Sequence, residues 1–196
     1  MRSFNPVGLF PPRNPQYEFI MDLANQYTEI ELEIGAGQGD HSFARALSQP
    51  QKLIIGVERT RNKFLMFNKL HQSKTLPNLI AVNADIVPWL TFLNKDILFS
   101  KIWILYPNPE IKSNNRRWIK APFFCEIIKR LKPHAEIEMA TNLEEYAVEV
   151  RDLSFKNWGL YPKINKYNGP ARTQFEKKYL DRNESCFQIV LSQNFQ

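Results

Sequence analysis

Apolar residues follow two different spacings along the chain, and together they predict an α/β fold. Short apolar runs of strand length lie at 28–34, 52–57, 79–82, 101–105 and 135–140. Between and before these runs, apolar residues recur at helical spacing and predict helices over 17–24, 40–49, 61–70, 86–93 and 123–131. Strands that alternate with helices are typical of a mostly parallel sheet with helices on both faces.

The last part of the chain has a different pattern. Residues 153–162 and 184–192 alternate between apolar and polar side chains, which predicts a closing antiparallel hairpin. The hairpin brings the sheet to seven strands. No repeat or linker interrupts the chain, so residues 1–196 are expected to form a single Rossmann-like domain, with the Pro-rich segment 1–12 as an irregular N-terminal arm.

Three glycines at alternate positions, Gly35, Gly37 and Gly39, separate the first strand from the helix that follows it. Glycine adopts positive φ without strain and, lacking a Cβ, lets a ligand approach the backbone closely. Such a turn at the carboxyl end of a strand is where open α/β sheets bind nucleotide-like ligands. A dinucleotide site has the spacing G-x-G-x-x-G, whereas this chain has G-x-G-x-G. A turn that merely joins a strand to a helix is the alternative.

Carboxylates near the glycines indicate the kind of ligand. Glu33 precedes the turn, and it would repel a diphosphate but attract a cationic amino group. Glu58 ends the second strand, and its two oxygens can accept hydrogen bonds from both hydroxyls of a ribose. S-adenosylmethionine has an ammonium, a sulfonium and no phosphate, so a class I methyltransferase cofactor site is predicted. Asp85, after the third strand, would face the adenine, or would cap the helix that begins at Ile86.

The net charge of +6 favours a polyanionic partner, although basic surfaces are often only solvated. Basic residues concentrate in 112–120 and 163–182. Cys125 and Cys186 have neither the spacing of a metal site nor that of a disulfide framework, so we expect no metal and a reducing cytoplasm. No apolar run approaches the roughly 20 residues of a membrane span. Monomer and homodimer both remain open.

The fourth strand runs directly into Tyr106-Pro107-Asn108-Pro109-Glu110. Two prolines stiffen the backbone and would hold the side chain of Asn108 out from the end of the strand. In an open α/β sheet, this edge is where a reacting group would meet a bound cofactor. A plain turn, with Asn108 bonded to its own backbone, is the alternative.

Taken together, these motifs resemble those of the bacterial tRNA (guanine-N7)-methyltransferases, over about residues 31–180. The glycine turn of that family is matched by Glu33–Gly39, and its Gly-x-Glu by Gly56–Glu58. Its Pro-Asp-Pro loop corresponds to Tyr106–Glu110, and its Thr-x-Phe-Glu segment to Thr173–Glu176. The last two motifs point to this family in particular, because the glycine turn alone indicates only a methyltransferase.

The resemblance implies methyl transfer from S-adenosylmethionine to guanine N7 of a tRNA. The cofactor residues that it implies are Glu33, Gly35, Gly37, Gly39, Glu58 and Asp85. The residues expected around the guanine are Asn108, Asn142, Thr173 and Glu176. The residues expected at RNA phosphates are Lys112, Arg116, Arg117, Arg172, Lys177 and Lys178.

Asn108 and Asn142 stand where the family has aspartates. Guanine N7 has a lone pair and no proton, so its methylation needs positioning rather than a general base. Loss of the two charges therefore predicts weakened turnover. Two alternatives remain: a homologue that binds RNA with little or no catalysis, and a methyltransferase with another substrate, such as another nucleic acid or an amino group.

Overall fold

The computed structural model describes residues 3–74, 76–107 and 117–193, and seven strands of this part form one sheet. The strands are β1 (Glu29–Ile34), β2 (Lys52–Glu58), β3 (Leu79–Asn83), β4 (Phe99–Leu105), β5 (Leu131–Thr141), β6 (Tyr161–Lys166) and β7 (Phe187–Ser192). Their order is β3-β2-β1-β4-β5-β7-β6, and β7 runs antiparallel to both neighbours while the other adjacent pairs are parallel. The predicted fold class is confirmed.

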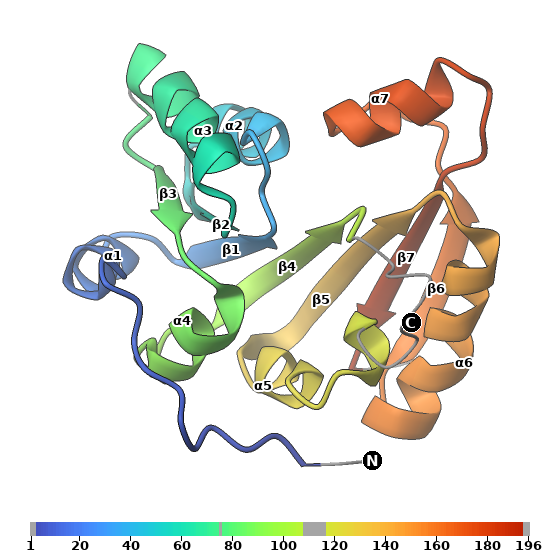
Figure 1. Cartoon of the computed structure of the whole chain (residues 1–196), viewed down its shortest axis with the longest axis horizontal. Coiled ribbons are helices and arrows are strands. Elements are labelled where there is room, and N and C mark those ends of the chain that lie inside the picture. Colours follow the sequence, from blue (N-terminus) through green and yellow to red (C-terminus); the bar gives the residue numbers. More distant parts are fainter. Residues whose placement is uncertain (1–2, 75, 108–116, 194–196) are drawn as a thin grey trace.

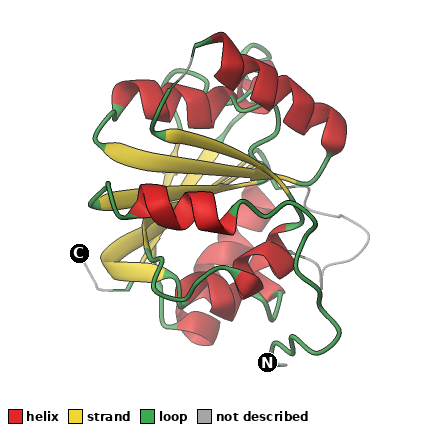
Figure 2. Cartoon of the chain, turned by 90° about the vertical axis from the view of Figure 1, so that its left-hand side faces the viewer, coloured by secondary structure: helices red, strands yellow, loops and turns green. Residues whose placement is uncertain are grey.

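Helices cover both faces of the sheet (Figures 1 and 2). They are α1 (Tyr17–Ala24), α2 (Asp40–Ser48), α3 (Arg61–Ser73), α4 (Ile86–Phe92), α5 (Phe124–Ile128), α6 (Glu144–Trp158) and α7 (Gln174–Leu180), with the short 3-10 helix η2 (Trp118–Lys120). α2 and α3 pack on one face through a small core around Phe67, and the larger core lies under α4, α5 and α6 on the other face. None of the described helices is long and apolar enough to cross a membrane.

Side chains of β1 alternate between the two faces of the sheet, and on one face the buried side chain is charged. Ile30 and Leu32 point into the larger core, whereas the intervening Glu31 points to the opposite face and is still only 1% exposed. Burial would raise the pKa of Glu31, but hydrogen bonds from Arg45 and Trp103 lower it below its usual value. Part of this face is therefore closed by paired charges rather than by apolar packing.

Three elements differ from the prediction, and one of them is α7, which lies in the basic segment 163–182 where no helix was predicted. The helix expected over 123–131 is limited to α5, because the buried guanidinium of Arg130 donates to the carbonyls of Leu90 and Leu93 and the chain then enters β5 at once. The first hairpin strand was expected at 153–162 but is β6, since α6 continues to Trp158. Gly159 ends that helix with a φ of 67°.

Gly39 is the glycine of the turn with the least room for a side chain. Its φ is 86°, and a Cβ there would lie 2.0 Å from Cδ2 of Phe67. Gly37 has a φ of 60°, but nothing lies within 4 Å of its Cβ position. We expect Gly39→Ala to lower the free energy of unfolding by about 2–3 kcal/mol, measured by urea denaturation, from backbone strain plus overpacking. Gly37→Ala should cost only about 1 kcal/mol, from strain alone, and equal losses would contradict the role of Phe67.

Candidate active site

A cavity of about 120 Å³ lies at the carboxyl edge of the sheet, between the glycine turn and α7. The glycine turn, the start of α2, the end of β4 and the start of α7 contribute most of its lining. The lining residues are Glu33, Gly35, Ala36, Gly37, Gln38, Asp40, His41, Lys63, Leu105, Tyr106, Thr173, Gln174 and Phe175. Glu33, Gly35, Gly37 and Thr173 are thus brought together from segments more than 130 residues apart in the sequence.

The glycine turn is fastened to the end of β2. The amides of Gly35 and Ala36 both donate to the carbonyl of Val57, at 2.8 and 3.1 Å. The amide of Gly37 donates to Oε2 of Glu58 at 2.9 Å, and that of Thr60 donates to Oε1 at 2.6 Å. Glu58 and the glycine turn are therefore in direct contact at this edge of the sheet.

Glu33 forms an acidic wall of the cavity and is only 2% exposed. Its Oε2 accepts a hydrogen bond from the hydroxyl of Ser42 and lies 3.2 Å from Nδ1 of His41. That Nδ1 is buried and has no hydrogen-bond partner among the described residues, and Oε1 takes part in neither contact. With Asp40 also in the lining, this wall suits a cationic group and disfavours a phosphate.

Asp85 lies outside the cavity lining, as does Glu58, but close to the end of β2. Its Oδ1 accepts from the amide of Val87 at 2.9 Å and so caps α4. Its Oδ2 lies 3.7 Å from Nη1 of Arg59, the residue that follows Glu58. The capping role is therefore present, and contact of Asp85 with the adenine stays a prediction.

The Thr-x-Phe-Glu segment is tied to the end of β4. Thr173 caps α7 by accepting from the amide of Glu176, and Glu176 is fully buried. Oε1 of Glu176 accepts from the hydroxyl of Tyr106 at 2.8 Å and from Nη2 of Arg172 at 2.6 Å. Burial would raise the pKa of Glu176, but the hydrogen bonds from Arg172 lower it below its usual value. Glu176 therefore holds α7 in place rather than facing an open site.

Arg172 and Arg117 differ from the expectation that they contact RNA phosphates. Nη1 of Arg172 lies 2.6 Å from Oε1 of Glu138, and the Arg172 side chain is only 11% exposed. Nη1 of Arg117 lies 2.6 Å from Oε2 of Glu149, and this side chain is 7% exposed. Because each guanidinium is engaged by buried or half-buried carboxylates, we correct both assignments to structural ion pairs.

Three of the expected residues, Asn108, Lys112 and Arg116, lie outside the described residues. Asn142 is described and directly follows β5 at the carboxyl edge of the sheet, partly exposed. The neighbouring Thr141 accepts from the amide of Leu143 at 3.1 Å, just before α6 begins. Asn142 is therefore at the edge of the sheet that bears the cavity.

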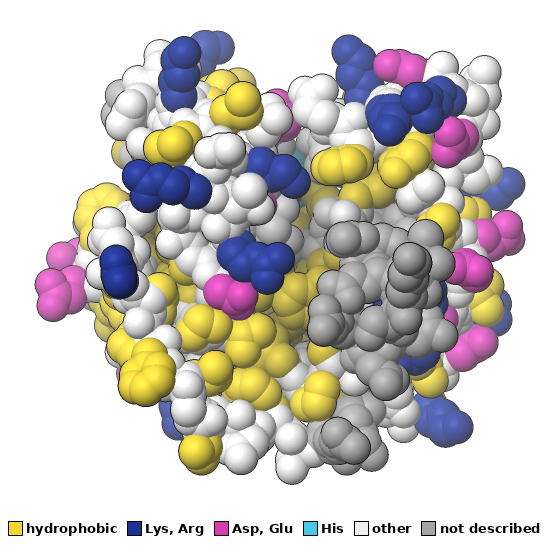
Figure 3. Space-filling view, in the orientation of Figure 1, with side chains coloured by type: hydrophobic (Ala, Val, Ile, Leu, Met, Phe, Trp, Pro, Cys, Tyr) yellow, Lys and Arg dark blue, Asp and Glu magenta, His cyan; other side chains and the backbone are white. Residues whose placement is uncertain are grey.

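Exposed basic residues gather on both sides of the hollow above the sheet (Figure 3). Lys177 and Lys178 are exposed on α7, and Arg59 and Arg61 are exposed just before and at the start of α3. The basic residues on the α3 side are not among the predicted phosphate contacts, although the run from Arg59 to Lys63 carries three basic residues in five positions. A polyanion could therefore contact both sides of the hollow.

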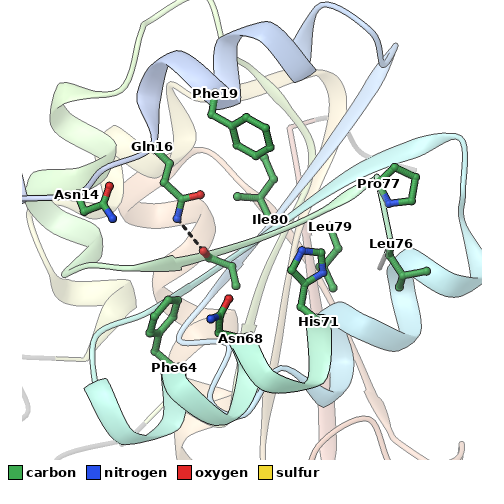
Figure 4. A pocket seen from close by; sticks show the side chains of 11 residues that line it. Asn14, Gln16, Phe19, Phe64, Asn68, His71, Leu76, Pro77, Leu79 and Ile80 are labelled. Atoms are coloured by element: carbon green, nitrogen blue, oxygen red, sulfur yellow. Dashed lines mark hydrogen bonds between the residues drawn. The ribbon is translucent and has the colours of Figure 1, made fainter. Parts of the chain in front are cut away.

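A larger hollow, of about 540 Å³, lies between α1 and α3 along the edge strand β3 (Figure 4). Phe19, Phe64 and Ile80 give it apolar walls, and the side chain of Gln16 donates to the carbonyl of Ala81 at 2.9 Å. Its described lining residues include no acid and none of the glycine turn. It does not have the chemistry of the cavity at the carboxyl edge, and we do not assign the active site to it.

The chain is similar to known proteins in sequence and in fold. A family model described as "Putative methyltransferase" matches residues 27–189. The tRNA (guanine-N(7)-)-methyltransferase of Neorickettsia sennetsu is 32% identical over 130 residues, which are 65% of this chain and 59% of that protein. A "Bifunctional methyltransferase" of Rickettsia conorii is 31% identical over 197 residues, or 94% of this chain and 36% of that protein. The chain thus spans less than two thirds of the length of these relatives.

Among solved structures, a variant of 16S rRNA (adenine(1408)-N(1))-methyltransferase from Catenulisporales acidiphilia, with cosubstrate SAM, superposes with a TM-score of 0.65. The two chains are 13% identical, and the match covers 92% of each, so it supports the fold alone. The family match, by contrast, covers β1 to β6, the beginning of β7, the glycine turn and the Thr-x-Phe-Glu segment. The resemblance inferred from the motifs is confirmed, and the chain belongs to the methyltransferase family that this model describes.

Proposed function

We propose that the chain is a cytoplasmic, S-adenosylmethionine-dependent methyltransferase that methylates guanine N7 in tRNA. The observation that carries the proposal is the contact between the Gly37 amide and Glu58, beside the buried carboxylate of Glu33. This arrangement offers a ribose acceptor and a partner for an ammonium group at one edge of the sheet. The names of the relatives support tRNA as the substrate.

The residues present fit the cofactor. Glu33 would hold the ammonium group, Glu58 the ribose hydroxyls and Asp85 the adenine, while Gly35 and Gly37 leave the backbone open to close approach. When bound, the cofactor supplies a methyl group on a sulfonium, which is ready for transfer to a nucleophile. A phosphate-bearing cofactor would meet the acids Glu33 and Asp40 and is disfavoured.

The substrate side needs positioning above all, because guanine N7 attacks through a lone pair and has no proton to lose. Thr173 lines the cavity and Asn142 lies at the same edge of the sheet, so we place them near the guanine together with Asn108. We assign Glu176 to holding α7 through Arg172 and Tyr106. Exposed lysines on α7 would contact the phosphates, which predicts an affinity for tRNA that falls steeply with salt.

Transfer of a tritium-labelled methyl group to unmodified tRNA, followed by nucleoside analysis, tests the proposal. We expect the label in 7-methylguanosine. Label in another nucleoside would mean a different substrate atom, and cofactor and tRNA binding without transfer would favour an RNA-binding homologue. A calorimetric titration that detects no binding of S-adenosylmethionine would contradict the proposed function altogether.

A further inference from the structure

Phe175 is an exposed aromatic residue at the mouth of the cavity. It lies at the start of α7, between the capping residue Thr173 and the buried Glu176, and it lines the cavity together with both Thr173 and Gln174. Its side chain is nevertheless 51% exposed. An apolar ring that is left half in solvent beside a cavity has apolar surface available to a ligand.

The ammonium group of a lysine lies over the face of this ring. Nζ of Lys63, which extends from α3 on the other side of the cavity, lies 5.7 Å from the centre of the Phe175 ring. Lys63 also belongs to the cavity lining. The two side chains thus meet across the mouth of the cavity, with the π face of Phe175 turned toward a positive charge.

We propose that Phe175 is the stacking platform for the target base, and that Lys63 gives up the ring to the base and binds a backbone phosphate instead. This inference rests on the proposed function. Proteins that act on single nucleotides stack unpaired bases on aromatic side chains. A purine that gains positive charge as its N7 is methylated should be attracted to the same π face that now attracts the ammonium of Lys63.

The fold of α7 depends little on this ring. The helix is capped by Thr173 and is fastened by the bonds of Glu176 to Arg172 and Tyr106. A second contact, between the rings of Tyr106 and Tyr179 with centroids 5.9 Å apart, also joins α7 to the end of β4. Removing the Phe175 ring should therefore leave the protein folded, so a functional effect can be separated from unfolding.

The test compares Phe175→Leu with Phe175→Trp. Base stacking on an aromatic side chain predicts that Leu lowers tRNA affinity, measured without cofactor, and kcat/KM each by about 10-fold, and that Trp keeps both within about threefold of the parent. Because Phe175 also lines the cavity, calorimetric affinity for S-adenosylmethionine is measured for both variants, and in Phe175→Leu it should fall by less than the affinity for tRNA. Phe155→Leu is a matched control, because Phe155 lies on α6 and is 55% exposed; it should behave as the parent.

The proposal is overturned if Phe175→Leu binds and methylates tRNA as the parent does, or if Phe175→Trp loses as much as Phe175→Leu. The first outcome would show that the ring contributes nothing to substrate binding or turnover. The second would show that another aromatic ring does not replace phenylalanine at this position of α7, so that stacking is not its role. Thermal denaturation of each variant shows whether the fold is intact. If the parent protein itself transfers no methyl group to tRNA, the proposed function fails instead, which is a separate result.

Discussion

Replacing Glu58 by Gln should weaken the binding of S-adenosylmethionine by about 10²-fold. Each oxygen of Glu58 accepts a backbone amide, from Gly37 at 2.9 Å and from Thr60 at 2.6 Å. Glutamine has a single acceptor oxygen, so its NH₂ group would face one of these N–H donors. The unpaired donor would destabilise the turn with or without ligand. The loss of affinity comes from the ribose hydroxyls, which would lose a charged acceptor, and a hydrogen bond to a charged group contributes about 1.5–3 kcal/mol.

Isothermal titration calorimetry with S-adenosylmethionine measures this effect directly. Glu126→Gln makes the same chemical change on α5, where Glu126 pairs with Lys129 on the surface, and it should leave the affinity as in the parent. If Glu58→Gln binds the cofactor as tightly as Glu126→Gln does, Glu58 is not the ribose acceptor. The glycine turn would then be held by β2 for structural reasons only.

Restoring the aspartates of the family should raise methyl transfer to tRNA, by about 10²-fold for each electrostatic contact regained. Asn142 keeps the carbonyl acceptor of an aspartate but lacks the negative charge that would stabilise a purine becoming cationic. It directly follows β5, at the edge of the sheet that bears the cavity, so Asn142→Asp would place a carboxylate there. Asn108→Asp makes the corresponding change in the Pro-Asn-Pro motif, at a position that lies outside the described residues.

Initial rates on unmodified tRNA, for the single variants and the double variant, measure the gain. Asn165→Asp is a suitable control, since it adds the same charge at an exposed position of β6. Its rate should not rise, because a general increase in negative charge only weakens RNA binding. Should the double variant transfer no more methyl than the parent, the asparagines do not explain any weakness in turnover.

The cofactor side of the site could be predicted because its residues lie within two short segments. Gly37 and Glu58 belong to one β-α-β unit, and parallel pairing of its strands brings their carboxyl ends together whatever the rest of the chain does. The substrate side was less predictable. Arg172 and Arg117 were expected to meet phosphates, but a sequence shows only that a residue is charged, and their partners Glu138 and Glu149 lie 34 and 32 residues away.

By itself, the sequence determined the succession of the seven strands and of the helices α1 to α5, and the acidic glycine turn, because periodicity and glycine chemistry act over a few neighbouring residues. Only the tertiary structure decided where α5 ends, since the guanidinium of Arg130 donates hydrogen bonds to carbonyls at the end of α4. It also decided which basic residues stay available to a polyanion and that Lys63 meets Phe175 across the cavity. These outcomes depend on burial and on contacts between distant segments, which local patterns do not encode.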